Sequence, residues 1–150
     1  MKRLIYTSLI AVIFDRIIKL MVMSLDKSIV IIKNFFSITF VTNMGGAWSI
    51  LSGYRWLLII ISIISLIVIY FAFIKGNKLG KLNGITLGLL IGGIIGNLLD
   101  RIIYGYVIDY LDFYIFGYNF PIFNLADSLI VISVIILIII ELKGDKHVRG

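Results

Sequence analysis

Four long apolar runs set the limits on how this chain folds. Residues 56–74, 83–99 and 125–140 are nearly free of charge, and residues 4–25 form a fourth run that charged side chains interrupt. Each run approaches the roughly 20 residues that an α-helix needs to cross a bilayer. The chain is 61% hydrophobic, well above the roughly half-apolar composition of soluble domains. We therefore expect an integral membrane protein, mainly α, that forms a single domain over residues 1–150 with four transmembrane helices at about 4–25, 56–74, 83–99 and 124–142.

Lysine and arginine are unevenly distributed among the segments that connect these runs. Eight lie on one side of the predicted spans and four on the other, the two sets being Lys2, Arg3, Lys75, Lys78, Lys81, Lys143, Lys146 and Arg149 against Lys27, Lys33, Arg55 and Arg101. Because cytoplasmic segments are enriched in basic residues, this distribution predicts that both termini are cytoplasmic. The topology accounts for the net charge of +6, so the charge gives no support to nucleic-acid binding.

Two segments outside the predicted spans have the composition of short strands. Residues 26–55 are rich in β-branched and aromatic side chains that partly alternate with polar ones, and Gly45–Gly46 marks a turn. Residues 101–123 contain five tyrosines and the only proline, and aromatic rings of this kind favour the membrane–water interface. We expect both segments to form a small extracytoplasmic β platform on the outer leaflet.

The sequence limits the chemistry that the protein can perform. There is no cysteine, which excludes thiol catalysis, disulfides and cysteine metal sites. The single histidine, His147, lies in a polar tail, so neither a histidine-activated nucleophile nor a histidine metal site is expected. Walker and dinucleotide motifs are also missing. We expect no metal and no cofactor.

Polar side chains in the predicted spans gather toward one end of the helices. Such residues are costly in a membrane and indicate a functional site. Asp109 and Asp127 are joined by a segment that must turn back on itself, so the two carboxylates can meet. A close pair in a poorly hydrated place shares one proton, as in aspartic-protease dyads. The polar residues at this end are Asp15, Asn97, Asp100, Asp109, Asn124 and Asp127.

These polar positions also have structural interpretations. The alternatives are that Asp15 pairs with Lys19 or Arg16, that Asp100 pairs with Arg101, that Asp112 is solvated, that Asn43 only forms a turn, and that Asn124 caps a helix. Glycine also recurs every four residues in the third run, at positions 84, 88, 92 and 96. On a helix these glycines form one smooth stripe, which predicts close packing against another helix.

Several motifs occur in a fixed order along the chain. They are "FDRIIK" (14–19), "TNMGGAWSI" (42–50), "GNLLDR" (96–101), "VIDY" (107–110) and "FNLADS" (123–128). Together they resemble the motifs of bacterial lipoprotein signal peptidase, also called signal peptidase II. The resemblance implies a four-helix aspartic endopeptidase of the bacterial cytoplasmic (inner) membrane, with its active site near the outer leaflet. It also implies cleavage of diacylglyceryl-modified prolipoproteins on the amino side of the lipidated cysteine.

The resemblance also assigns roles to individual residues. Asp109 and Asp127 match the catalytic pair of the family. Two positions depart from its pattern, with Gly46 in place of alanine and Tyr110 in place of phenylalanine. We expect a monomer whose partners are prolipoproteins with a lipidated cysteine and membrane lipids. The remaining matched positions are the supporting or substrate-binding residues Asn43, Asn97, Asp100, Arg101, Asn124 and Ala126, and the structural polar residues Asp15 and Lys19.

Two other classes of function remain open. A small proton-coupled carrier or channel subunit would use Asp15, Asp100 and Asp127 as a relay. Relays need polar groups through the full bilayer, whereas the inner half of each predicted span is almost purely apolar. An accessory protein would hold a membrane complex together through the glycine stripe, but that function leaves Asp109 and Asp127 unexplained.

Overall fold

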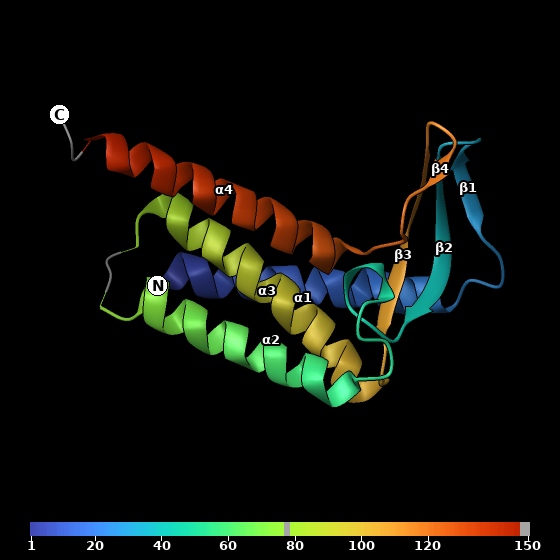
Figure 1. Ribbon diagram of the computed structural model, residues 1–150, viewed down its shortest axis with the longest axis horizontal. Coiled ribbons are helices and arrows are strands. Elements are labelled where there is room, and N and C mark those ends of the chain that lie inside the picture. Colours follow the sequence, from blue (N-terminus) through green and yellow to red (C-terminus); the bar gives the residue numbers. More distant parts are fainter. Residues whose placement is uncertain (77–78, 148–150) are drawn as a thin grey trace.

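The computed structural model describes residues 1–76 and 79–147, and it places a bundle of helices beside a small sheet (Figure 1). The predicted membrane class, mainly α with a β platform, is confirmed. Lys78 and Arg149, which were counted in the topology, lie outside the described residues. The helices in the described residues are α1 (Lys2–Met23), α2 (Arg55–Ile69, extended by a π-helical turn at Tyr70–Ile74), α3 (Lys81–Ile103) and α4 (Leu125–His147).

Each helix is long enough to cross a bilayer. Among the described residues, three stretches are both long and apolar enough, namely Arg55–Ile74, Lys81–Ile103 and Leu125–Leu142. Helix α1 has 22 residues, which corresponds to roughly 33 Å, but it carries charged side chains along its length. The outside of the bundle is aliphatic, with Ile10, Ile64 and Ile135 more than half exposed. Such a surface suits lipid.

Helix α3 is the centre of the bundle and packs against α1, α4 and α2. The predicted glycine stripe faces α1, as expected for close helix packing. A Cβ atom on Gly88 would lie 2.7 Å from the carbonyl oxygen of Leu4, and one on Gly92 would lie 2.6 Å from Cβ of Ala11. The backbones of α1 and α3 are therefore near enough for short polar side chains to meet between them.

The sheet lies at one end of the bundle, and its strands run across the ends of the helices (Figure 1). It is antiparallel with the order β1-β2-β3-β4, where β1 is Ile29–Ile32, β2 is Phe36–Asn43, β3 is Val107–Ile115 and β4 is Tyr118–Asn119. In the central β2–β3 pair, Val41 lies opposite Asp109 and Asn43 lies opposite Val107. Asn43 and Asp109 are thus diagonal neighbours on one face of the sheet.

Candidate active site

The polar residues of the predicted site meet where α3 ends, α4 begins and β3 passes between them. Most are buried, and hydrogen bonds connect them into one network. The buried members are Asp15, Lys19, Asn97, Asp100, Asp109 and Asn124.

Asp109 projects from β3 and is 2% exposed. Its Oδ2 accepts a hydrogen bond of 2.9 Å from the Asn43 side-chain amide, and its Oδ1 accepts one of 2.7 Å from that of Asn124. Burial raises the pKa of Asp109 to about 6, and the nearby charge of Asp127 adds to the effect. The carboxyl of Asp109 therefore titrates close to neutral pH.

Asp127 lies in the first turn of α4 and forms a capping box with Asn124. The backbone N–H of Asp127 donates to Asn124 Oδ1 at 2.9 Å, and the backbone N–H of Asn124 donates to Asp127 Oδ2 at 3.2 Å. The carbonyl of Asn124 accepts the first helical hydrogen bond, from Ser128. Asn124 is thus the N-cap, as one of the structural interpretations predicted, and the cap fixes the Asp127 carboxylate against the helix start.

Asn124 also bridges the two aspartates. Its Oδ1 is occupied by the N–H of Asp127, so its amide nitrogen faces the other way and donates to Asp109. The side chain is fully buried. One amide group therefore sets the position of Asp109 relative to Asp127.

Lys19 fixes the direction of a second amide. Its ammonium group, which can only donate, donates to Asn97 Oδ1 at 3.0 Å. The amide nitrogen of Asn97 must then point away from Lys19, and it donates to Asp127 Oδ1 at 2.7 Å. Lys19 therefore orients the Asn97 amide so that its N–H group donates to Asp127.

An ion cluster joins α1 to α3 behind the aspartates. Lys19 Nζ lies 2.9 Å from Asp15 Oδ2 and 2.7 Å from Asp100 Oδ2, and Arg16 lies 2.8 Å from Asp100 Oδ1. Of the predicted alternatives, Asp15 pairs with Lys19, and Asp100 pairs with residues of α1 and not with Arg101. Asp15 Oδ1 also accepts the N–H of Ala126, which ties the start of α4 to α1.

Arg101 connects α3 to the loop that follows β2. Its guanidinium donates to the carbonyl oxygen of Gly45 at 3.0 Å. Asn43 holds the same loop, since its Oδ1 accepts the N–H of Gly45 and its amide nitrogen donates to the carbonyl of Gly46 at 3.3 Å. Asn43 is therefore both a turn residue and a ligand of Asp109. The two interpretations of this residue were not exclusive.

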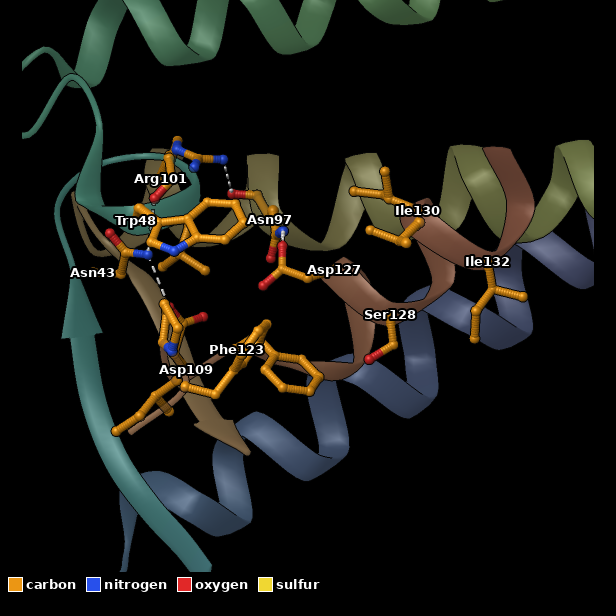
Figure 2. Close-up of a pocket in the computed structure, with 16 residues that line it drawn as sticks. Asn43, Trp48, Asn97, Arg101, Asp109, Phe123, Asp127, Ser128, Ile130 and Ile132 are labelled. Atoms are coloured by element: carbon orange, nitrogen blue, oxygen red, sulfur yellow. Dashed lines mark hydrogen bonds between the residues drawn. The ribbon is translucent and has the colours of Figure 1, made fainter. Parts of the chain in front are cut away.

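The loop carries Trp48 over the aspartates. Trp48 has φ +53° and is 65% exposed, and it packs edge-to-face on Phe120. In Figure 2 the indole lies beside the ends of Asp109 and Asp127, which enter from different elements. Trp48 was not among the predicted site residues. Its only signal was an aromatic residue after a glycine pair.

A cavity of about 530 Å³ opens beside the two aspartates. Its polar end is formed by the aspartates with Asn43, Asn97 and Arg101. The rest is lined mainly by apolar side chains of residues 120–123 and of α4, where Ser128 is the polar exception (Figure 2). Val131 and Ile132 line it although both are more than half exposed on α4. The cavity therefore opens onto the lipid-facing side of this helix.

Two further residues make contacts that the sequence did not predict. Asp112, which was expected to be solvated, is partly exposed, and its Oδ2 also accepts hydrogen bonds of 3.2 Å from Ser37 and Thr39 of β2. Tyr110 was noted only as a departure from the family pattern, and it is 3% exposed with its hydroxyl bonded to Leu125. Within residues 1–76 and 79–147, no histidines and carboxylates group as ligands for a metal ion.

Comparisons with known proteins agree with this arrangement. A family model described as signal peptidase (SPase) II matches residues 7–143. A solved bacterial membrane enzyme at 2.3 Å resolution is 39% identical, with a TM-score of 0.89 over 98% of this chain and 92% of that chain. A second, at 1.9 Å, is 40% identical, with a TM-score of 0.84 over 95% of this chain and 94% of that chain. The chain belongs to the signal peptidase II family, aspartic peptidases that cleave the signal peptides of prolipoproteins.

Proposed function

We propose that Asp109 and Asp127 are the catalytic pair, and that they cleave the peptide bond on the amino side of the lipidated cysteine. The observation that carries the proposal is that one residue, Asn124, donates hydrogen bonds to both carboxylates. The Asn124 side-chain amide donates to Asp109, and the Asn124 backbone donates to Asp127. The pair also lies at the polar end of an otherwise apolar cavity.

The hydrogen bonds of the pair direct its proton toward the cavity. Every oxygen of the two carboxylates accepts one N–H, from Asn43, Asn97 or Asn124. These contacts are all donors, so the scaffold offers no acceptor to a carboxyl proton. The proton is left to the partner aspartate or to a bound substrate. The ionised member can then deprotonate water while the protonated member donates to the peptide carbonyl.

The shape of the cavity supports a lipidated substrate. Its apolar wall follows α4 outward to the exposed side chains of Val131 and Ile132, where acyl chains could enter from the bilayer. Arg101 and Asn43 hold the loop of Trp48 at the opposite end, above the aspartates. The polar segment after the cysteine would lie there, under the platform.

The location of this chemistry follows from charge and depth. We infer a protein of the bacterial cytoplasmic membrane with both termini in the cytoplasm, because the basic residues favour that side. The aspartates then lie near the outer leaflet, the depth at which the lipid on a prolipoprotein is anchored. One chain contains both carboxylates and the cavity, so a monomer is sufficient for activity.

The test is turnover of a diacylglyceryl-modified prolipoprotein by purified variants in detergent, followed by product size. Asp109→Asn and Asp127→Asn are each expected to lose activity by about 10³-fold or more, because neither variant can share a proton across the pair. Asp112→Asn is the matched control, since this carboxyl lies on the same strand but its hydrogen bonds come from Ser37 and Thr39 of β2. Its turnover should stay within about threefold of the wild type.

Near-normal turnover by either Asp109→Asn or Asp127→Asn would overturn the assignment of the pair. A precursor without the diacylglyceryl group tests the substrate separately. If the cavity binds acyl chains, the unlipidated precursor should be cleaved far more slowly. Equal cleavage of both precursors would contradict the role given to the cavity while leaving the catalytic pair intact.

A further inference from the structure

Tyr110 contacts the start of α4 at two points. It follows Asp109 in β3, and its backbone N–H donates to the carbonyl oxygen of Phe123 at 3.0 Å. Its hydroxyl accepts the N–H of Leu125 at 3.1 Å. The residue between Phe123 and Leu125 is Asn124, which contacts both aspartates. Tyr110 therefore holds the chain on each side of the bridging residue.

The hydroxyl of Tyr110 supplies an acceptor for one of the N–H groups that have no partner within the helix. Leu125 is the first residue of α4, so no helical carbonyl can accept its N–H. The neighbouring amides have other acceptors, with Ala126 bound to Asp15 of α1 and Asp127 bound to the Asn124 side chain. Among these contacts, only the one from Tyr110 comes from the strand that carries Asp109. It links the two elements that hold the carboxylates.

The hydroxyl is suited to act as a permanent neutral acceptor. Burial raises the pKa of Tyr110 above its usual range, and the carboxylates of Asp15, Asp127 and Asp109 raise it further. The phenol therefore stays protonated wherever the aspartates titrate. A phenylalanine ring would fill the same space but would leave the Leu125 N–H without this partner.

We propose that Tyr110 is a positioning residue, whose hydroxyl latches β3 to the first turn of α4 and so fixes the Asn124 amide between Asp109 and Asp127. The proposal rests on the catalytic role proposed for the two aspartates. Without the latch, the backbone bonds to Phe123 and the Asn124 side chain still join β3 to the start of α4, but the first N–H of the helix is no longer held, so the separation of the carboxylates varies more. Small displacements of reacting groups have large effects on the rate.

The test compares Tyr110→Phe with Tyr104→Phe. Each variant removes one phenolic oxygen, and Tyr104 accepts a bond of 3.3 Å from Arg16 without contacting α4. Tyr110→Phe should lower kcat roughly tenfold and leave KM within about twofold, because it disturbs the pair and not the apolar cavity. The acidic and basic limbs of the pH profile of kcat should also move closer together. Weaker coupling between the carboxylates reduces the difference between their two apparent pKa values. Tyr104→Phe should keep the wild-type kcat and limb spacing.

A measurement independent of catalysis tests the latch itself. Amide hydrogen exchange at Leu125, followed by NMR in detergent, should accelerate in Tyr110→Phe and not in Tyr104→Phe. Unchanged exchange at Leu125 would refute the latch. Faster exchange with wild-type kcat and limb spacing would refute the positioning role, as would a raised KM with unchanged kcat. Failure of the catalytic assignment would appear differently, as turnover by Asp127→Asn.

Discussion

Replacing Lys19 by methionine should destabilise the fold more than any change of a surface lysine. Lys19 is completely buried in the span of α1, and its ammonium group contacts Asp15, Asp100 and Asn97 within 2.7–3.0 Å. Methionine keeps the length and apolar stem of the side chain. The substitution therefore removes the charge and its hydrogen bonds while creating little empty volume.

The size of the stability loss depends on which contacts Asp15 and Asp100 keep when the lysine is removed. Asp100 keeps the ion pair with Arg16 at 2.8 Å, but Asp15 keeps only the N–H of Ala126. One carboxylate is thus left buried without a cation, and breaking a buried pair in this way costs about 3–5 kcal/mol. A second change, Asp15→Asn, removes the stranded charge and should restore part of that loss.

Unfolding in mixed micelles, followed by circular dichroism, measures these differences. Lys27→Met is the matched control, because Lys27 is exposed and its loss should change the unfolding free energy by less than about 0.5 kcal/mol. Unfolding of Lys19→Met within about 1 kcal/mol of the wild type would show that no buried charge is stranded. A double variant no more stable than Lys19→Met would likewise show that the unpaired charge of Asp15 is not the cause of the loss.

Two further predictions concern pH and the loop after β2. Because burial raises the pKa of Asp109 from 3.8 to about 6, the folded state holds this proton more tightly than the unfolded chain, and stability should fall as pH rises through that interval. The loss is at most about 3 kcal/mol, and thermal unfolding at pH 4 and pH 7 should show a smaller difference in Asp109→Asn than in the wild type. In the loop, a Cβ on Gly45 would lie 2.7 Å from backbone atoms of Ser49 and Ile50, whereas one on Gly46 would lie 3.6 Å from the nearest atom. Gly45→Ala should therefore lower turnover strongly while Gly46→Ala keeps it, and equal turnover by the two variants would contradict the loop geometry.

The helices and their closest packing could be predicted because their signals are local. Length and apolar composition located the spans, and the glycine repeat predicted the close helix contact that α1 makes. The ends were less well predicted, since α3 begins at Lys81 and continues to Ile103, beyond the predicted 83–99. Side-chain composition sets the lipid-facing part of a helix, whereas its ends depend on capping and tertiary contacts.

The members of the polar network could be predicted, but their connections could not. The pairing of Asp15 with Lys19 was visible as an i, i+4 spacing, whereas its bond to Ala126 depends on how α1 and α4 are rotated and placed in depth. The hydrogen bonds of Asp112 could not be predicted for a similar reason. Its partners on β2 are set by the strand register, which places Ser37 directly opposite Asp112. The roles of the two aspartates remain predictions until the variants are assayed.

The ion cluster has a consequence for how the protein is made. Asp15, Arg16, Lys19 and Asp100 carry equal numbers of opposite charges, and all lie on α1 and α3. A nascent chain can therefore neutralise these charges within the membrane before its fourth helix leaves the ribosome. Helix α4 then brings Asp127 to an ion cluster that has already formed between α1 and α3. The insertion of α4 places Asp127 beside Asp109. With the catalytic roles proposed for Asp109 and Asp127, proteolytic activity would appear only at the last step of membrane insertion.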